Sequence, residues 1–219
     1  MHRTAWTTRT AVTVAAAATV LIAAPNASQA APAAAPHSVV AQASASGGIA
    51  GLKGVDYGTW QRDVQSVVDT ARPYLKERIA ASPAGEKPAI VLDIDNTTLE
   101  TDFHYFWTFP TPAIQSMRDM VREANAQGVA VFFVTARPGI IESLTSSNLK
   151  AVGYPVTGLY VRDLPDLFHE VSTYKTEKRA EIEARGYTVI ANFGNNTTDL
   201  VGGHAERTFK LPDYDGKLS

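Results

Sequence analysis

From residue 59 onward, hydrophobic and polar positions follow the period of an α-helix in some segments and the pattern of a buried β-strand in others. Over residues 59–81, apolar side chains from Trp60 to Ile79 recur every three or four positions, as on one face of a helix. Pro73 lies within this segment, so we expect the helix to break or kink there. The same reading predicts helices over residues 113–127, 138–152 and 173–185.

Short, continuous apolar runs separate these helices. Residues 88–94, 129–134 and 189–193 have the composition of strands that are buried on both faces of a sheet. Shorter strands are expected over residues 158–161 and 207–211. Because strands alternate with helices, the pattern predicts an α/β fold, namely a Rossmann-like three-layer sandwich with a mainly parallel central sheet.

An aromatic segment follows the first predicted strand. Its aromatic side chains are Phe103, Tyr105, Phe106, Trp107 and Phe109. The insertion up to residue 128 is too short for a large independent cap domain. These aromatics therefore belong to the core, or they form a small cap or flap beside an open site.

The first 54 residues have a different character. A weakly basic start, an apolar stretch at residues 11–24 and small residues up to Ala30 are typical of a secretory signal peptide over residues 1–30. The alternative is an uncleaved signal anchor, although the apolar stretch is short for a membrane span. Residues 31–54 are rich in Ala, Pro, Ser and Gly and predict a flexible spacer before one domain over residues 55–219.

Composition and charge restrict the functional classes. The 219 residues carry a net charge of -2, with both signs interspersed, and include no cysteine. Disulfide bonds and thiol chemistry are therefore excluded, and neither a nucleic-acid-binding surface nor a polybasic membrane patch is indicated. We expect a secreted, extracellular protein with a bacterial-like Sec-type signal and no stable membrane anchor after signal cleavage. The oligomeric state stays open.

The most informative stretch is residues 89–98, Ala-Ile-Val-Leu-Asp-Ile-Asp-Asn-Thr-Thr. Asp93 and Asp95 follow a buried strand and are two residues apart, so on an extended segment their side chains point to the same face. In open α/β sheets, ligands bind at the carboxyl ends of the strands. Two carboxylates this close repel each other unless a cation lies between them or one is protonated. The arrangement therefore indicates chemistry.

Two further strands also end in polar residues. Thr135 follows the second predicted strand, and Asn195 and Asp199 follow the fourth, while Lys175 lies near the start of the preceding helix. Because parallel strands end at one edge of the sheet, these side chains are expected to converge with the Asp93 pair. Such an oxygen-rich site suits Mg²⁺, which binds through a few carboxylates together with substrate phosphate.

These residues resemble, in order, the four motifs of the haloacid dehalogenase-like (HAD) superfamily. The motifs are Asp93-x-Asp95-x-Thr97, a strand ending in Thr135, Lys175, and Gly194-Asn195-x-x-x-Asp199. The segment from Tyr174 to Leu200 is similar to the secreted acid phosphatase branch (class B, subfamily IIIB-like) of that superfamily. The resemblance extends over roughly residues 58–212.

The resemblance implies a HAD-like fold and a secreted, Mg²⁺-dependent acid phosphatase that hydrolyses small-molecule phosphate monoesters. In that family the residue matching Asp93 is the nucleophile that becomes phosphorylated, and the residue matching Asp95 is the general acid and base. Thr135 and Lys175 match the phosphate-binding residues, although Lys178 lies in the same predicted helix and competes for this role. The implied metal ligands are Asp93, Asp95, Asn195 and Asp199.

Elementary chemistry agrees with these roles. A carboxylate nucleophile divides hydrolysis into two displacements, and a nearby proton donor assists the leaving group. Cations offset the charge on the phosphoryl oxygens, where most catalysis of this reaction resides.

One residue departs from the family pattern. Asn195 stands where the last motif usually has an acidic metal ligand, and its amide offers an oxygen without charge. We therefore expect weaker Mg²⁺ binding or greater dependence on Asp199. The departure also favours the alternative function, a catalytically weak or inactive HAD-fold binding or storage protein.

Other interpretations of the Asp93 and Asp95 pair fit less well. A calcium-binding EF-hand requires Gly and Glu where this chain has Thr98 and His104. The Asp-x-Asp site of a glycosyltransferase would leave the later motifs unexplained. A dehalogenase of the same superfamily is not expected to carry the second carboxylate.

Overall fold

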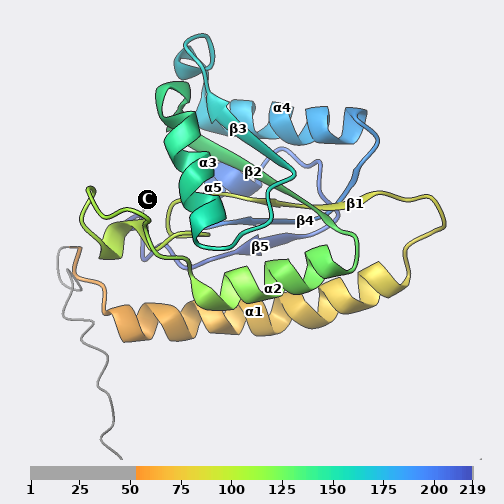
Figure 1. Ribbon diagram of the computed structural model, residues 1–219, viewed down its shortest axis with the longest axis horizontal. Coiled ribbons are helices and arrows are strands. Elements are labelled where there is room, and N and C mark those ends of the chain that lie inside the picture. Colours follow the sequence, from red (N-terminus) through yellow and green to blue (C-terminus); the bar gives the residue numbers. More distant parts are fainter. Residues whose placement is uncertain (1–52, 219) are drawn as a thin grey trace, which may run out of the picture. The chain divides into compact units, whose positions relative to one another are not determined.

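The computed structural model describes residues 53–218, and their five strands form one sheet in the order β3-β2-β1-β4-β5 (Figure 1). All four neighbouring pairs are parallel. The strands are β1 (Pro88–Leu92), β2 (Ala130–Pro138), β3 (Gly158–Arg162), β4 (Thr188–Gly194) and β5 (Thr208–Lys210). The expected signal peptide and nearly all of the expected spacer lie outside the described residues.

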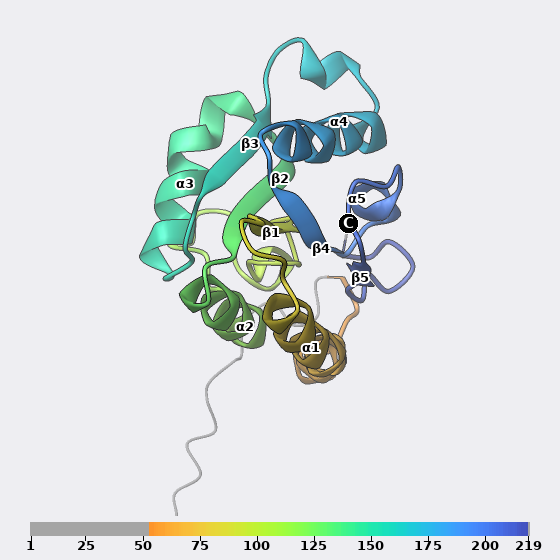
Figure 2. The same cartoon turned by 90° about the vertical axis from the view of Figure 1, so that its right-hand side faces the viewer.

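Helices cover both faces of this sheet (Figure 2). The α-helices are α1 (Tyr57–Ala80), α2 (Gln115–Ala126), α3 (Glu142–Ala151), α4 (Val171–Ala184) and α5 (Thr197–Leu200), with 3₁₀ turns η1 (Thr101–Phe103), η2 (Gly139–Ile141) and η3 (Asp166–Phe168). Helices α1, α2 and α3 lie on one face, and α4 and α5 lie on the other. The predicted three-layer α/β sandwich with a parallel sheet is therefore confirmed.

Helix α1 begins at an N-cap and continues through its proline. Asp56 accepts a hydrogen bond from the backbone N–H of Thr59 at 2.8 Å, which satisfies one of the free donors of the first turn. The break expected at Pro73 does not occur, since Tyr57–Ala80 is one continuous helix. Pro73 lies on the exposed face, where water can bond the carbonyl group that lacks its partner.

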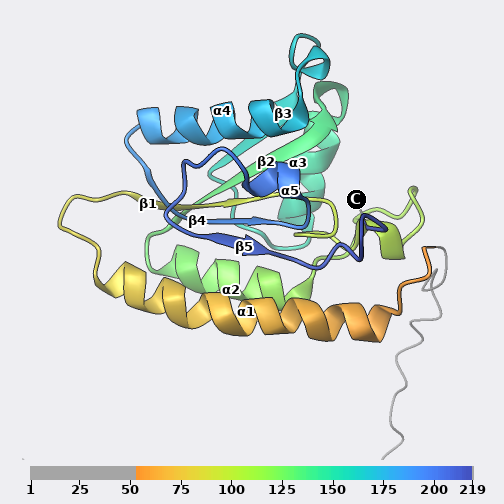
Figure 3. The same cartoon turned by 180° about the vertical axis from the view of Figure 1, so that it is seen from behind.

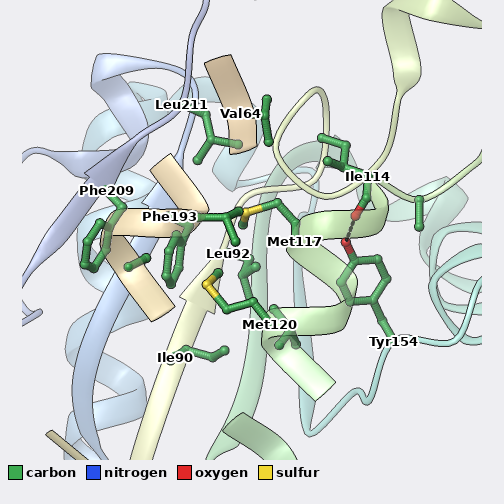
Figure 4. Packing of buried hydrophobic residues seen from close by; sticks show 14 of the residues in the cluster. Val64, Ile90, Leu92, Ile114, Met117, Met120, Tyr154, Phe193, Phe209 and Leu211 are labelled. Carbon is green, nitrogen blue, oxygen red and sulfur yellow. Dashed lines mark hydrogen bonds between the residues drawn. The ribbon is translucent and has the colours of Figure 1, made fainter. Parts of the chain in front are cut away.

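Two apolar clusters hold the layers together. The larger lies between the sheet and α1, α2 and α3 and includes Leu92, Met117, Met120 and Phe193 (Figure 4). Tyr154 is buried at its margin, and its hydroxyl donates to the carbonyl group of Thr98 at 3.0 Å. The core thus anchors the loop that follows β1.

The strand and helix boundaries depart from expectation mainly after β2. This strand extends to Pro138, which pairs with Arg162 of β3, and the next helix begins with the 3₁₀ turn η2. The edge strand β5 is parallel and short, and it lies on the α1 side of the molecule when viewed from behind (Figure 3). Among the described residues, no helix is both long and apolar enough to span a membrane.

Candidate active site

The register of the sheet brings the predicted motifs to one edge. Leu92 pairs with Phe133 of β2 and with Phe193 of β4, and the backbone N–H of Asp93 donates to the Phe193 carbonyl at 3.0 Å. Asp93 therefore lies between β2, which contains Thr135 near its carboxyl end, and the end of β4, which Asn195 follows. In Figure 1 this is the edge at which the loop after β1 and the C-terminus lie.

Lys175 links two buried carboxylates. Its ammonium group donates to Asp93 Oδ1 and to Asp199 Oδ1, at 2.6 Å each. All three side chains are buried. Lys178 instead pairs with Glu181 at 3.3 Å and lies over the Tyr160 and Tyr174 rings, so Lys175 is the lysine of this helix that is paired with Asp93.

Burial dominates the electrostatics of Asp93. Loss of solvent, together with the nearby charges of Asp199 and Asp95, raises the pKa of Asp93 to about 7, although Lys175 acts in the opposite direction. Burial would lower the pKa of Lys175, but Asp93 and Asp199 outweigh it and leave that pKa raised. Lys175 therefore stays charged, while Asp93 is an unusually basic carboxylate.

Asp95 is held by an arginine that the sequence reasoning missed. Arg137 donates from Nη2 to Asp95 Oδ1 at 2.7 Å and from Nε to Oδ2 at 3.1 Å, which is bidentate geometry. Burial would raise the pKa of Asp95, but these bonds and the guanidinium charge outweigh it and lower the pKa. A signal was present, since Arg137 follows Thr135 by two residues on an extended strand and therefore shares its face.

Thr135 lies buried at the same edge. Its hydroxyl oxygen accepts a hydrogen bond from the backbone N–H of Arg137 at 3.2 Å. The hydroxyl proton is thereby left to donate to another acceptor. The position fits the predicted contact with phosphate, which stays a prediction.

Asn195 is engaged by two other segments. Its Nδ2 donates to the Leu218 carbonyl at 2.6 Å, and its Oδ1 accepts from the Thr97 hydroxyl at 3.3 Å. Asn96 Nδ2 also donates to Leu218, at 2.9 Å. Because the carbonyl group can only accept, it requires an amide rather than a carboxylate at position 195. This contact could not be predicted from side-chain identities, because it involves a backbone group.

A network around α5 fixes Asp199. Its Oδ2 accepts from the backbone N–H of Asn196 at 2.8 Å. Arg179, one turn after Lys175 in α4 and almost fully buried, donates to the Asp199 carbonyl at 2.8 Å. A Cβ atom at Gly194 would lie 2.2 Å from Asp199 Cβ, so only glycine permits this approach.

The donor set fits a divalent cation, although less completely than expected. Among residues 53–218, no cluster of three or more His, Cys, Asp or Glu side chains is arranged to hold a metal. The Asp93 and Asp199 carboxylates nonetheless face one cation already, the Lys175 ammonium. Two carboxylates with neighbouring carbonyl oxygens are the hard donors that Mg²⁺ prefers.

The aromatic segment divides between core and surface. Phe103 is buried and stacks on Trp60, with ring centroids 4.2 Å apart. Tyr105, Phe106, Trp107 and Phe109 are exposed, and Tyr105 stacks on Trp107. The segment returns to the core at Thr111, whose backbone is bonded to Asn148 of α3. The core placement thus holds for Phe103, while a cap or flap formed by the exposed aromatics stays a prediction.

Comparison with known proteins identifies similar chains. The family model for the HAD superfamily, subfamily IIIB (acid phosphatase), matches residues 3–217. Acid phosphatase 1 of Solanum lycopersicum is 32% identical over 104 residues, which cover 47% of this chain and 41% of that protein. The stem 28 kDa glycoprotein of Glycine max is 30% identical over 106 residues, covering 47% and 42%. The matched segment is therefore less than half of either plant protein.

A solved structure shares the fold. The class C acid phosphatase from Bacillus anthracis superimposes with a TM-score of 0.57 at 20% identity, covering 72% of this chain and 79% of that one.

A more distant sequence relative, vegetative storage protein 1 of Arabidopsis thaliana, is 24% identical over 143 residues, covering 56% of this chain and 53% of that protein.

Proposed function

The chain belongs to subfamily IIIB of the HAD superfamily, the acid phosphatases, and from this premise we propose that it hydrolyses phosphate monoesters through an aspartyl-phosphate on Asp93. The observation that carries the proposal is the pairing of Asp93 and Asp199 with the buried Lys175, next to the Asp95 and Arg137 pair. One carboxylate is thereby supplied with positive charge for attack on phosphorus. A second carboxylate lies two residues away for proton transfer.

In the first step, a carboxylate oxygen of Asp93 attacks phosphorus. The bond between phosphorus and the ester oxygen breaks, and the leaving oxygen takes a proton from Asp95, which gives the free alcohol. Lys175 and the Thr135 hydroxyl would contact the phosphoryl oxygens and offset their growing charge. The products of this half-reaction are the alcohol and the phosphorylated Asp93.

In the second step, water attacks the phosphorus atom of the acyl phosphate. Asp95, now ionised, takes a proton from this water, and the bond between phosphorus and the Asp93 oxygen breaks. Inorganic phosphate leaves and both carboxyl groups return to their starting states. The two-residue spacing lets one carboxyl serve both steps.

Arg137 sets the condition for proton donation. While it is bonded to Asp95, that carboxyl stays ionised and holds no proton to donate. A substrate phosphoryl group offers the guanidinium a second anion with matching bidentate geometry. Transfer of Arg137 toward the phosphate would restore the pKa of Asp95 toward its usual range and allow protonation at acidic pH.

We further propose that the cofactor is Mg²⁺, held by Asp93, Asp199, the main-chain carbonyl of Asp95 and, as a neutral ligand, Asn195 Oδ1. When bound, the ion supplies positive charge to the phosphoryl oxygens. The raised pKa of Asp93 supports this proposal, because an acid phosphatase needs an ionised nucleophile below pH 7. A neighbouring dication would lower that pKa.

The surroundings support two finer proposals. The exposed ring pair of Tyr105 and Trp107 follows β1 and could stack on ring-bearing leaving groups. The layout of residues 1–30 supports export, and the chain is proposed to act outside the cell as a secreted protein.

The test is hydrolysis of a chromogenic aryl phosphate by wild type and by Asp93→Asn, with Mg²⁺ and with EDTA. We expect Asp93→Asn to lower kcat by about 10⁴-fold or more while the fold is kept, as for loss of other covalent nucleophiles. Asp69→Asn, which changes an exposed aspartate of α1, is the matched control and should retain full activity. Turnover by Asp93→Asn at the wild-type rate would refute the assignment.

A non-catalytic storage or binding protein is the second candidate. The neutral Asn195 and the similarity to vegetative storage protein 1 of Arabidopsis thaliana favour it. The same assay separates the candidates, because a storage protein would show no hydrolysis that depends on Asp93.

A further inference from the structure

The large apolar side chains that are exposed on the described part of the chain share a location. They follow the carboxyl ends of strands: Tyr105, Phe106, Trp107 and Phe109 after β1, Ile140 and Leu144 after β2, Leu164, Leu167 and Phe168 after β3, and Val201 after β4. These segments, which include the start of α3, follow the strands at the active-site edge (Figure 1). Apolar surface gathered around a polar site is typical of a ligand-binding region.

One part of this surface is hollowed. A cavity of about 580 Å³ lies between the loop after β2 and the loop after β3, within the size range of small-molecule sites. Its walls include Pro138, Gly139 and Ile140 on one side and Asp163, Leu164 and Leu167 on the other. A Cβ atom at Gly139 would lie 2.2 Å from Asp163 Oδ1, so the glycine lets the two loops approach each other closely.

The loop after β3 is held in place by an arginine. Arg162 donates to the carbonyl group of Asp166 at 2.7 Å and to that of His169 at 2.6 Å. These bonds close the loop at both ends of η3. The cavity is therefore formed before any ligand binds, and less entropy is lost when a ligand enters.

The cavity is connected to the proton donor of the proposed reaction through the chain at Pro138. Its first wall residue, Pro138, directly follows Arg137, whose guanidinium is bonded to Asp95. The ester oxygen must lie at Asp95 to receive its proton, so the rest of the leaving group starts there and extends away from Asp93. Apolar wall residues of the cavity thus begin one position after Arg137.

We propose that this cavity is the subsite for alkyl leaving groups, separate from the ring pair of Tyr105 and Trp107, and that the substrates include phosphate monoesters of apolar alcohols. The proposal rests on the phosphomonoesterase function proposed above and adds the substrate class. Charge supports it, because the cationic lining residue, Arg162, is already bonded to backbone carbonyls. The acidic lining residue, Asp163, disfavours leaving groups that carry further phosphates or carboxylates.

The experiment compares soluble n-alkyl phosphates from ethyl to hexyl phosphate. Each methylene that enters an apolar site adds to transition-state binding. We expect kcat/KM to rise about twofold per methylene, which corresponds to partial burial of the chain. Ethyl phosphate reports the basal reaction, because its chain is too short to fill the cavity.

Two variants of the same loop separate the cavity from general surface hydrophobicity. Leu164 and Phe168 are both highly exposed, but only Leu164 lines the cavity. The double variant Leu164→Ser/Leu167→Ser should reduce the hexyl-to-ethyl ratio of kcat/KM by about fivefold or more and leave ethyl phosphate hydrolysis unchanged. Phe168→Ser is the matched control and should keep the wild-type ratio.

The outcomes are distinct. A ratio that falls in the double variant and not in Phe168→Ser supports the subsite. A flat chain-length series, or a ratio lost equally in Phe168→Ser or in Phe106→Ser of the aromatic segment, overturns it while the phosphatase function stands. If ethyl phosphate is hydrolysed equally by wild type and Asp93→Asn, or by neither, the function proposed for the site fails, and the subsite fails with it.

Discussion

At the scale of single residues, the raised pKa of Asp93 has a consequence for stability. Burial raises this pKa from an ordinary value of 3.8 to about 7, so between these values the folded chain binds a proton that the unfolded chain releases. The stabilising contribution of Asp93 is therefore fully present below about pH 4 and is lost as the pH rises through about 7. Asparagine at this position removes that dependence.

We expect thermal unfolding in EDTA to show this dependence directly. The difference in Tm between wild type and Asp93→Asn should become less favourable to wild type as the pH rises from about 4 to about 8. The Asp69→Asn variant, which keeps Asp93, serves as the reference for unrelated effects of pH on Tm. A Tm difference that stays constant over this range would contradict the raised pKa.

A second prediction at this scale concerns the replacement of Arg137. Arg137→Met removes the group that lowers the pKa of Asp95, so Asp95 keeps its proton to higher pH. The alkaline limb of the kcat/KM profile, which reports the free enzyme, should move to higher pH, and kcat itself should fall about 10²-fold or more as phosphate contacts are lost. Arg137→Lys keeps the charge without the bidentate geometry and should restore only part of the rate.

A merely structural Arg137 would give another result. The variants would then lower Tm, while the pH profile of kcat/KM would keep its wild-type limbs. Measuring both quantities on the same proteins separates the two cases.

At the scale of elements, the C-terminal segment is part of the site architecture. Leu218 is buried, and its carbonyl group accepts from Asn195 after β4 and from Asn96 after β1. The last residues of the described chain are thereby bonded to the loop after β1, which carries the first motif, and to the loop after β4, which carries the last motif. The amide of Asn195 thus has a structural role that does not depend on metal binding.

The variant Asn195→Asp tests whether the bond from Asn195 to the Leu218 carbonyl group stabilises the fold. The carboxylate would face the Leu218 carbonyl without a donor between them, so in EDTA we expect the free energy of unfolding to fall by about 1–3 kcal/mol. Chemical denaturation measures this loss. With Mg²⁺ the added charge should recover part of the stability, whereas unchanged stability in EDTA would show that the Leu218 contact contributes nothing.

Elements also show what the sequence could and could not predict. The convergence of Asp93, Thr135 and Asn195 was predictable, because parallel topology fixes which strand ends meet, although β2 continues past Thr135 to Pro138. The continuation of α1 through Pro73 was not, since solvent exposure decides whether a lost hydrogen bond matters. Backbone partners such as the Leu218 carbonyl leave no pattern in side-chain identities.

Some residues of the candidate site could be assigned only from their spacing in the family motifs. Lys175 and Lys178 are equivalent by composition and differ only in which face of α4 turns toward Asp93. Arg137 was visible in the strand period but stands in no motif quoted for the family. Arg179 was hidden, because a buried arginine that bonds backbone carbonyls looks like a surface residue in the sequence.

At the scale of the whole molecule, the topology explains why one edge carries the chemistry. The chain runs outward from β1 to β3 and then crosses to β4, so the strand order changes direction between β1 and β4. Loops after neighbouring strands separate at such a point and leave room for a ligand. Asp93 lies at that point, with the exposed apolar loops around it.

The most direct test of the aspartyl-phosphate uses the Asp95→Asn variant with 4-nitrophenyl phosphate labelled in the phosphoryl group. This leaving group departs without a proton, whereas hydrolysis of the acyl phosphate needs the missing base. We predict a burst of one nitrophenolate per enzyme and acid-stable label on the peptide that contains Asp93, both absent when Asp93→Asn is added. Label on another residue, or no retained label despite the burst, would contradict a covalent intermediate on Asp93.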